Sequence, residues 1–255
     1  MGVQIRGGDV RSRHGHSLAA HKLETAVPVV VHRDAVMADG HRSGGGTRRY
    51  LSICSSRCST IYILPILNVM IGITGGIGSG KSRICRELIR RGYSVYDCDR
   101  EAKRIIHEDP VVRAAICALF GDEAFEGERY NTVYVAKRVF AEPALLEQLN
   151  TIVHPAVKAD VVHKNPDFVE SAILYEAGLD EVCEKVVVVD APEDIRIERT
   201  IGRDYNDEMT TENINKVRAR MRAQSKHEGD LLIWNDGNTP TPEVVDKLTQ
   251  WLWKN

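Results

Sequence analysis

The sequence predicts an α/β protein with three layers, in which helices cover both faces of a five-stranded parallel sheet. Three observations predict it. From residue 70 to the end, short apolar runs alternate with longer amphipathic stretches, as strands and helices do in parallel α/β folds. The run Lys185 to Val189 is almost entirely valine, as expected for a parallel strand buried on both faces. A glycine-rich turn separates the first apolar run from the first helical stretch.

The elements follow from these patterns in chain order. The expected strands are the apolar runs at 71–74, 93–97, 168–175, 185–189 and 231–234. The expected helices lie at 81–91, 192–203, 211–227 and 241–253, with further helical, charge-rich sequence across 100–165. Gly92 is a suitable stop for the first helix. Pro192 begins the next, with acidic Glu193 and Asp194 in its first turn, where the helix dipole favours them.

Composition narrows the class of protein. With 255 residues, 43% of them hydrophobic, the chain can bury a full core. A net charge of −2 gives no indication of a nucleic-acid or membrane-surface partner. The longest apolar run, 61–73, is interrupted and falls short of the roughly 20 residues that span a bilayer. The six cysteines show no paired framework. We therefore expect a cytoplasmic protein with reduced thiols, no nucleic-acid or membrane partner and no obligate protein partner.

The glycine-rich turn carries the strongest motif. Residues 75–82 read Gly-Gly-Ile-Gly-Ser-Gly-Lys-Ser and match G-x-x-x-x-G-K-[ST] between an expected strand and helix. Glycines let successive backbone N–H groups point at phosphate oxygens, and the helix N-terminus adds its positive end. Lys81 should reach the β- and γ-phosphates, and the Ser82 hydroxyl should ligate Mg²⁺. The sequence predicts a P-loop NTPase fold that binds ATP and Mg²⁺ through Gly76, Ile77, Gly78, Ser79, Gly80, Lys81 and Ser82.

This motif indicates nucleotide binding without deciding the class of protein. A GTPase would add a D-x-x-G switch and an N-K-x-D base reader. No Asp has Gly three residues later, and the nearest match to the second motif, residues 215–218, ends in Arg. A non-enzymatic nucleotide switch remains the weak alternative.

Two carboxylates end the second expected strand, in the segment Asp97-Cys98-Asp99. Ligands of parallel sheets gather at the carboxyl ends of the strands, so these side chains should face the γ-phosphate. A carboxylate there can accept a proton from an acceptor hydroxyl or help to hold Mg²⁺. The alternative is that Asp99 only caps the next helix.

Together these motifs resemble dephospho-coenzyme A kinase over about residues 70–250. The resemblance depends on several segments that occur in the same order as in that family. They are 72–82, the Asp-x-Asp at 97–99, Leu-Asn-Thr-Ile-Val-His-Pro at 149–155, Ile-Leu-Tyr-Glu at 173–176, Arg-Ile-Glu-Arg-Thr at 196–200, Arg-Asp at 203–204 and Asn-Asp-Gly at 235–237.

The resemblance implies ATP-dependent phosphorylation of the ribose 3′-hydroxyl of dephospho-coenzyme A. It implies a core at 70–99 and 168–255, a helical coenzyme A-binding insertion at about 100–167 and a lid at about 199–228. Asp99 would be the catalytic base, and Asn235 and Gly237 would lie by the adenine. The alternative is a P-loop kinase of another nucleotide or nucleoside, with the same core and a different acceptor pocket.

Three arginines, Arg196, Arg199 and Arg203, share one face of the expected helix and could clamp the phosphates of ATP. A solvated basic face is the alternative. We favour Arg199, as a catalytic residue beside Lys81, and Arg203, both binding ATP, and do not favour Arg196.

The expected substrate-binding residues are Thr74, Asp97, Asp99, Lys103, His154 and Glu176. For three of these residues the sequence leaves the role in the site open. The family often has Arg at the position of Lys103, and Lys loses the bidentate geometry. His154 could be structural, and Glu176 could hold Mg²⁺ through water or merely cap a helix. Asp190 ends a strand as a metal-binding Asp would, but we expect it to start a helix.

Residues 1–69 differ from the rest. They hold nine Lys/Arg, four Asp/Glu and five of the nine histidines, without lasting periodicity. We expect a disordered leader before a domain at 70–255. We favour the interpretation that residues 1–69 are upstream sequence, translated in frame from an early start codon. The alternative is that they are a transit peptide.

Overall fold

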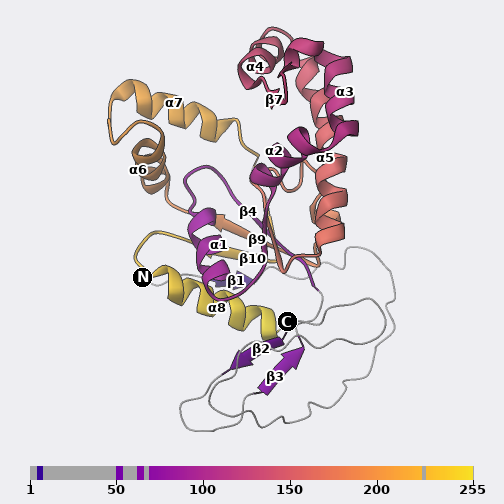
Figure 1. Ribbon diagram of the computed structural model, residues 1–255. Helices are drawn as coiled ribbons and strands as arrows, with labels where there is room; N and C mark the ends of the chain where they lie inside the picture. Colours follow the sequence, from indigo (N-terminus) through magenta and orange to yellow (C-terminus); the bar gives the residue numbers. More distant parts are fainter. Residues whose placement is uncertain (1–4, 8–49, 54–61, 66–68, 226–227, 255) are drawn as a thin grey trace, which may run out of the picture. The chain divides into compact units, whose positions relative to one another are not determined.

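The computed structural model describes residues 5–7, 50–53, 62–65, 69–225 and 228–254 (Figure 1). The chain divides into two units, one of residues 1–10 with 70–255 and one of residues 11–69. In the second unit, β2 (Tyr50–Ile53) and β3 (Tyr62–Pro65) form an antiparallel pair. The expectation of a disordered leader falls mostly on residues outside those described. The elements below belong to the first unit.

A mixed sheet in the order β1-β10-β9-β4-β8-β5 forms the centre of this unit. Its parallel strands are β4 (Ile71–Thr74), β5 (Val95–Asp97), β8 (Phe168–Glu170), β9 (Lys185–Asp190) and β10 (Leu231–Trp234). The predicted five-stranded parallel sheet is confirmed. The additional strand β1 (Ile5–Gly7) pairs antiparallel with β10, whose outer edge would otherwise leave its backbone groups unpaired.

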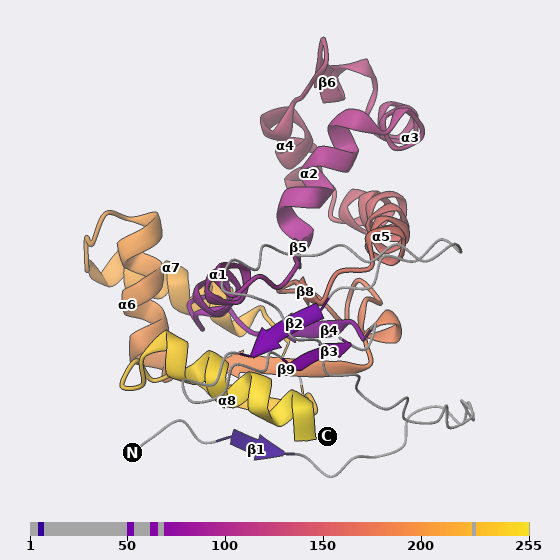
Figure 2. The ribbon, with the colours of Figure 1, turned by 60° about the horizontal axis from the view of Figure 1, so that its bottom comes forward.

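Helices pack on both faces of the sheet because its strands are apolar on both sides. Val186 and Val188 of β9 join a core cluster with Val157 and Val161 of α5 (Ala144–Lys164). Val187 and Val189, which alternate with them along the strand, are also buried and point to the opposite face. There α1 (Lys81–Arg90) and α8 (Thr241–Lys254) lie side by side (Figures 1 and 2).

The insertion between β5 and β8 is helical, as predicted. It contains α2 (Cys98–Glu108), α3 (Pro110–Phe120), α4 (Thr132–Ala141) and α5. A short 3₁₀ helix, η1 (Asp122–Ala124), and the hairpin of β6 (Phe125–Glu126) with β7 (Arg129–Tyr130) were not expected.

A second pair of helices, α6 (Glu193–Asp204) and α7 (Thr211–Arg222), forms a hairpin packed through Ile197, Ile201 and Val217. In Figure 1 this α6–α7 hairpin lies at the upper left and the α2–α5 helices at the upper right.

The third strand is shorter than predicted, since β8 ends at Glu170 rather than at 175. The Ser171 hydroxyl accepts the N–H of Ile173, and the N–H of Ala177 bonds to the carbonyl of Ile173. These local bonds draw the backbone into a turn over 172–178 and end the strand. The 3₁₀ helix η2 (Asp180–Val182) follows.

None of the helices in the described part of the chain is both long and apolar enough to cross a membrane.

Candidate active site

The glycine-rich loop lies between β4 and α1, at the carboxyl end of the central strand. Gly78 and Gly80 have φ values of +75° and +97°, a region that residues with a side chain rarely adopt. The Lys81 ammonium donates a 2.6 Å hydrogen bond to the carbonyl oxygen of Gly75 and so folds back over the loop. Burial lowers the pKa of Lys81, and the nearby carboxylates of Glu170 and Asp99 oppose that shift.

Ser82, the predicted metal ligand, donates from Oγ to Oε1 of Glu170 at 2.9 Å. Glu170 is the last residue of β8, which neighbours β4 in the sheet. Glu170 was not among the expected site residues, because this strand was expected to end at 175. An acidic residue at a strand end was the signal that could have found it.

The two predicted carboxylates at the end of β5 have different environments. Asp97 is the N-cap of α2, and its side chain accepts the N–H of Arg100 at 3.0 Å. Asp99 lies exposed in the first turn of the helix and acts electrostatically on Lys81. The capping role considered for Asp99 therefore belongs to Asp97, and Asp99 stays available to a ligand.

Arg199 of α6 lies against the phosphate loop. Its Nη1 donates to the carbonyl oxygens of Gly78, Ser79 and Asn235 at 3.4, 3.3 and 3.1 Å. The side chain of Asn235 donates from Nδ2 to the Ser79 carbonyl at 2.8 Å. A Cβ on Gly237 would lie 3.3 Å from Nη2 of Arg199. The structure thus brings together three of the residues predicted to bind ATP: Arg199, Asn235 and Gly237.

Arg203 and Arg196 are placed otherwise than expected. Arg203 is exposed and pairs with Asp204, Nε to Oδ1 at 2.7 Å. Arg196, which we did not favour, donates from Nε to the Ile77 carbonyl at 2.9 Å and pairs with Asp190 at 3.2 Å. Asp190 therefore holds an arginine of α6, while the carboxylate bonded to Ser82 is Glu170.

Gln224, two residues after α7, makes a contact that was not expected from the sequence. Its Oε1 accepts the N–H of Ile77, within the phosphate loop, at 2.7 Å.

Three of the remaining predicted substrate-binding residues, Lys103, His154 and Glu176, follow the loop in the chain, and the fourth, Thr74, directly precedes it. Lys103 is exposed on α2, one turn after Asp99. His154 is half-buried on α5, and burial lowers its pKa. Glu176 is exposed in the turn after β8. Thr74 is fully buried at the end of β4, and its Oγ1 has no hydrogen-bond partner among the described residues.

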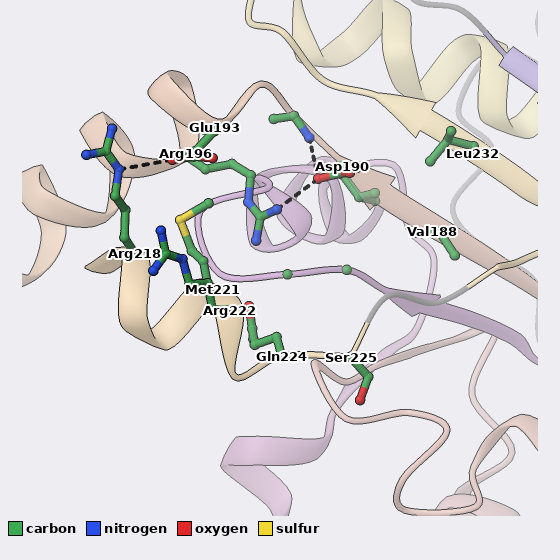
Figure 3. A pocket seen from close by; sticks show the side chains of 14 residues that line it. Val188, Asp190, Glu193, Arg196, Arg218, Met221, Arg222, Gln224, Ser225 and Leu232 are labelled. Carbon is green, nitrogen blue, oxygen red and sulfur yellow. Dashed lines mark hydrogen bonds and ion pairs between the residues drawn. The ribbon is translucent and has the colours of Figure 1, made fainter. Parts of the chain in front are cut away.

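A cavity of about 610 Å³ adjoins the loop at Gly75 and Gly76. Figure 3 shows Arg196, Met221, Arg222 and Gln224 around it, with Val188 and Leu232 of the sheet on another side.

The parallel strands follow the order β10-β9-β4-β8-β5, and a glycine-rich phosphate loop comes directly after the central strand β4. A lysine and a serine begin α1. These features define a P-loop kinase fold. The family model described as dephospho-CoA kinase matches residues 69–241. The chain belongs to the dephospho-CoA kinase family.

Individual relatives agree with this assignment. The chain is 40% identical over 166 residues to a dephospho-CoA kinase of Porphyromonas gingivalis, covering 63% of this chain and 79% of the relative. It is 36% identical over 189 residues to one of Bacteroides fragilis, covering 71% and 91%. Among solved structures, TT1252 from Thermus thermophilus superposes with a TM-score of 0.59 at 28% identity, over 73% of this chain and 96% of that one.

Proposed function

We propose that this kinase transfers the γ-phosphoryl group of ATP to the ribose 3′-hydroxyl of dephospho-CoA, giving CoA and ADP. One observation carries the proposal. The Asp99 carboxylate acts electrostatically on Lys81, and Arg199 of α6 donates to the loop carbonyls of Gly78 and Ser79. An acceptor hydroxyl needs such a carboxylate, and a transferring phosphoryl group needs such a positive charge.

The loop and its partners bind the phosphates of ATP. Lys81 exchanges the Gly75 carbonyl for phosphate oxygens, which are stronger acceptors because they are charged. Arg199, already held against the loop, adds a second positive charge near the phosphates. Asn235 and Gly237 lie beside Arg199, where the adenine is expected.

The donor set also fits a magnesium ion. The Ser82 hydroxyl and the Glu170 carboxylate are hard oxygen ligands, and they already lie within hydrogen-bond distance of each other. In P-loop enzymes the loop Ser and a strand-end carboxylate hold the metal, which neutralises charge developing on the phosphates. We assign Ser82 as the direct ligand and Glu170 as the supporting carboxylate, in preference to Glu176 or Asp190.

Asp99 orients the acceptor hydroxyl and accepts its proton as the new bond forms. Asp97 holds the start of α2 and thereby the position of Asp99. The helices α2–α5, with Lys103 and His154, form the acceptor side. Arg203, on the α6–α7 hairpin, binds ATP when this hairpin acts as a lid and excludes water. The enzyme acts in the cytoplasm on a small-molecule substrate.

An assay of ADP release across acceptors tests the proposal. Dephospho-CoA, the nucleoside monophosphates, pantothenate and a sample without acceptor are compared at the same concentration of ATP and Mg²⁺. We expect turnover with dephospho-CoA to exceed that with every other acceptor, and ³¹P NMR to show the new 3′-phosphate. Faster turnover of a nucleoside monophosphate would instead identify a kinase of another nucleotide.

A further inference from the structure

The peptide groups on both sides of Ile77 are bound by side chains of the α6–α7 segment. The Ile77 N–H donates to Oε1 of Gln224 at 2.7 Å, and the Ile77 carbonyl accepts from Nε of Arg196 at 2.9 Å. Ile77 lies in the middle of the loop whose N–H groups are built to bind phosphate. Gln224 thus occupies a donor that belongs to the nucleotide site.

These two bonds differ in how they respond to a phosphate. A phosphate oxygen accepts hydrogen bonds, so it competes with Gln224 for the Ile77 N–H. Since it is charged, it is also the stronger acceptor. The Ile77 carbonyl is itself an acceptor, so a phosphate does not replace it directly, although a phosphate can attract the Arg196 guanidinium. Arg196 is also paired with Asp190 at 3.2 Å, so its bond to Ile77 can persist while the bond to Gln224 is exchanged.

Arg196 and Gln224 both approach the loop closely at Gly76. A Cβ on Gly76 would clash with Nη2 of Arg196 and lie only 3.1 Å from Oε1 of Gln224. Gly76 has no positive φ, so its backbone conformation does not require glycine. A larger residue at this position would have to displace the ends of these two side chains from their present places.

The two side chains also differ in how they are anchored. Arg196 lies on α6 and is held by Asp190 at 3.2 Å, which fixes it. Gln224 follows the last turn of α7, beside the exposed Arg222 and the cavity of about 610 Å³. In Figure 3 the Gln224 side chain points toward the loop from the end of α7. The cavity gives the end of α7 room to move when its bond to the loop is released.

We propose that Gln224 is a latch that ATP displaces. Without nucleotide it binds the Ile77 N–H and holds the end of α7 against the loop. ATP takes over this N–H through a phosphate oxygen and releases the end of α7, while Arg196 keeps α6 on the loop. The inference rests on the proposed binding of ATP, not on the identity of the acceptor.

Affinity for a non-hydrolysable ATP analogue with Mg²⁺ tests the latch, in the full chain and without acceptor. Gln224→Ala removes the competitor and should lower Kd by about two- to tenfold, the range expected for one hydrogen bond. Gln224→Glu keeps an acceptor, strengthens it by charge and repels phosphate, so Kd should rise at least about tenfold. Gln250→Ala, at an exposed position of α8, is the matched control and should change nothing.

The Ile77 amide itself gives a second readout, by NMR of protein labelled with ¹⁵N-isoleucine. Its hydrogen exchange should be slow without nucleotide in the natural sequence, fast in Gln224→Ala, and slow again in both when the analogue is bound. Weaker binding by Gln224→Ala, or an Ile77 amide unaffected by the substitution, would overturn the proposal. Because no acceptor is present, its failure is distinct from failure to phosphorylate dephospho-CoA.

Discussion

The hydroxyl of Ser82 and the carboxylate of Glu170 are joined by a 2.9 Å hydrogen bond, although 88 positions of sequence separate them. The bond links the start of α1 to the end of β8 and places a carboxylate beside the expected magnesium ligand. Neighbouring carboxyl ends in a parallel sheet make this meeting possible.

Replacing this carboxylate should weaken the metal site. In Glu170→Gln the supporting charge is lost while the shape remains, so we expect the Mg²⁺ concentration for half-maximal activity to rise by about 10- to 100-fold. Metal binding is followed separately by titrating Mn²⁺ with electron spin resonance. Glu176→Gln is the control and should shift neither value. A larger effect of Glu176→Gln would move the supporting role to that residue.

Lys81→Ala removes charge that becomes more important as the phosphoryl group transfers. We expect kcat to fall by about 10²-fold or more, the scale for losing one such electrostatic donor. Steady-state kinetics and the melting temperature are measured together, since the variant should stay folded. Turnover near that of the natural sequence would contradict the role of the loop.

Asp99→Asn keeps the size of the side chain but cannot readily accept the hydroxyl proton. We expect kcat to fall by about 10²- to 10⁴-fold, with ATP affinity retained because the loop is untouched. Asp97→Asn should be milder, because Asn is also a good N-cap and can accept the N–H of Arg100. If Asp97→Asn loses more activity, the two roles must be exchanged.

An ionic network between α2 and α5 should make stability depend on pH. Lys164 and Arg104, hydrogen-bonded to buried Glu101, lower its pKa to about 2 from an ordinary 4.5. Because the folded-state pKa is the lower one, the contribution of Glu101 is full above pH 4.5 and is lost as pH falls toward 2.

Glu101→Gln should therefore lower the free energy of unfolding at pH 7 by about 1–3 kcal/mol, with a difference that narrows below pH 4.5. Urea unfolding from pH 7 to pH 3 measures this difference. Glu147→Gln, at an exposed position of α5, is the control and should have little effect. A difference that stays constant with pH would rule out the ionised carboxylate as the cause.

A protein that begins at Met70 should fold and keep kcat within about twofold, because every residue assigned to the site follows that position. The three-residue pairing of β1 with β10 would be lost at the sheet edge, so we expect only a few degrees' change in melting temperature. A large loss of stability or activity on removing 1–69 would show that the leader contributes to the core.

The sequence predicted the features that depend on local pattern. The phosphate loop, the parallel strands and the helices α1, α6 and α8 follow from motif and periodicity, and the structure has them close to where we expected. It could not predict where β8 ends, because the turn after Glu170 depends on a side-chain bond of Ser171 within an apolar run. The contacts of Arg196 and Gln224 with Ile77 were also out of reach, since they join residues 119 and 147 positions apart.

The side chain of Asn235 donates a hydrogen bond to the Ser79 carbonyl across 156 positions of sequence. Arg199 donates to the backbone carbonyls of Ser79 and Asn235. This has a consequence for the order of events during synthesis. The ribosome makes the glycine-rich loop before it makes Arg199 and Asn235, the partners that brace it. A nascent chain stalled before Asn235 would carry the whole phosphate motif without the Asn235 bond, so tight nucleotide binding should arise only after Asn235 has been made.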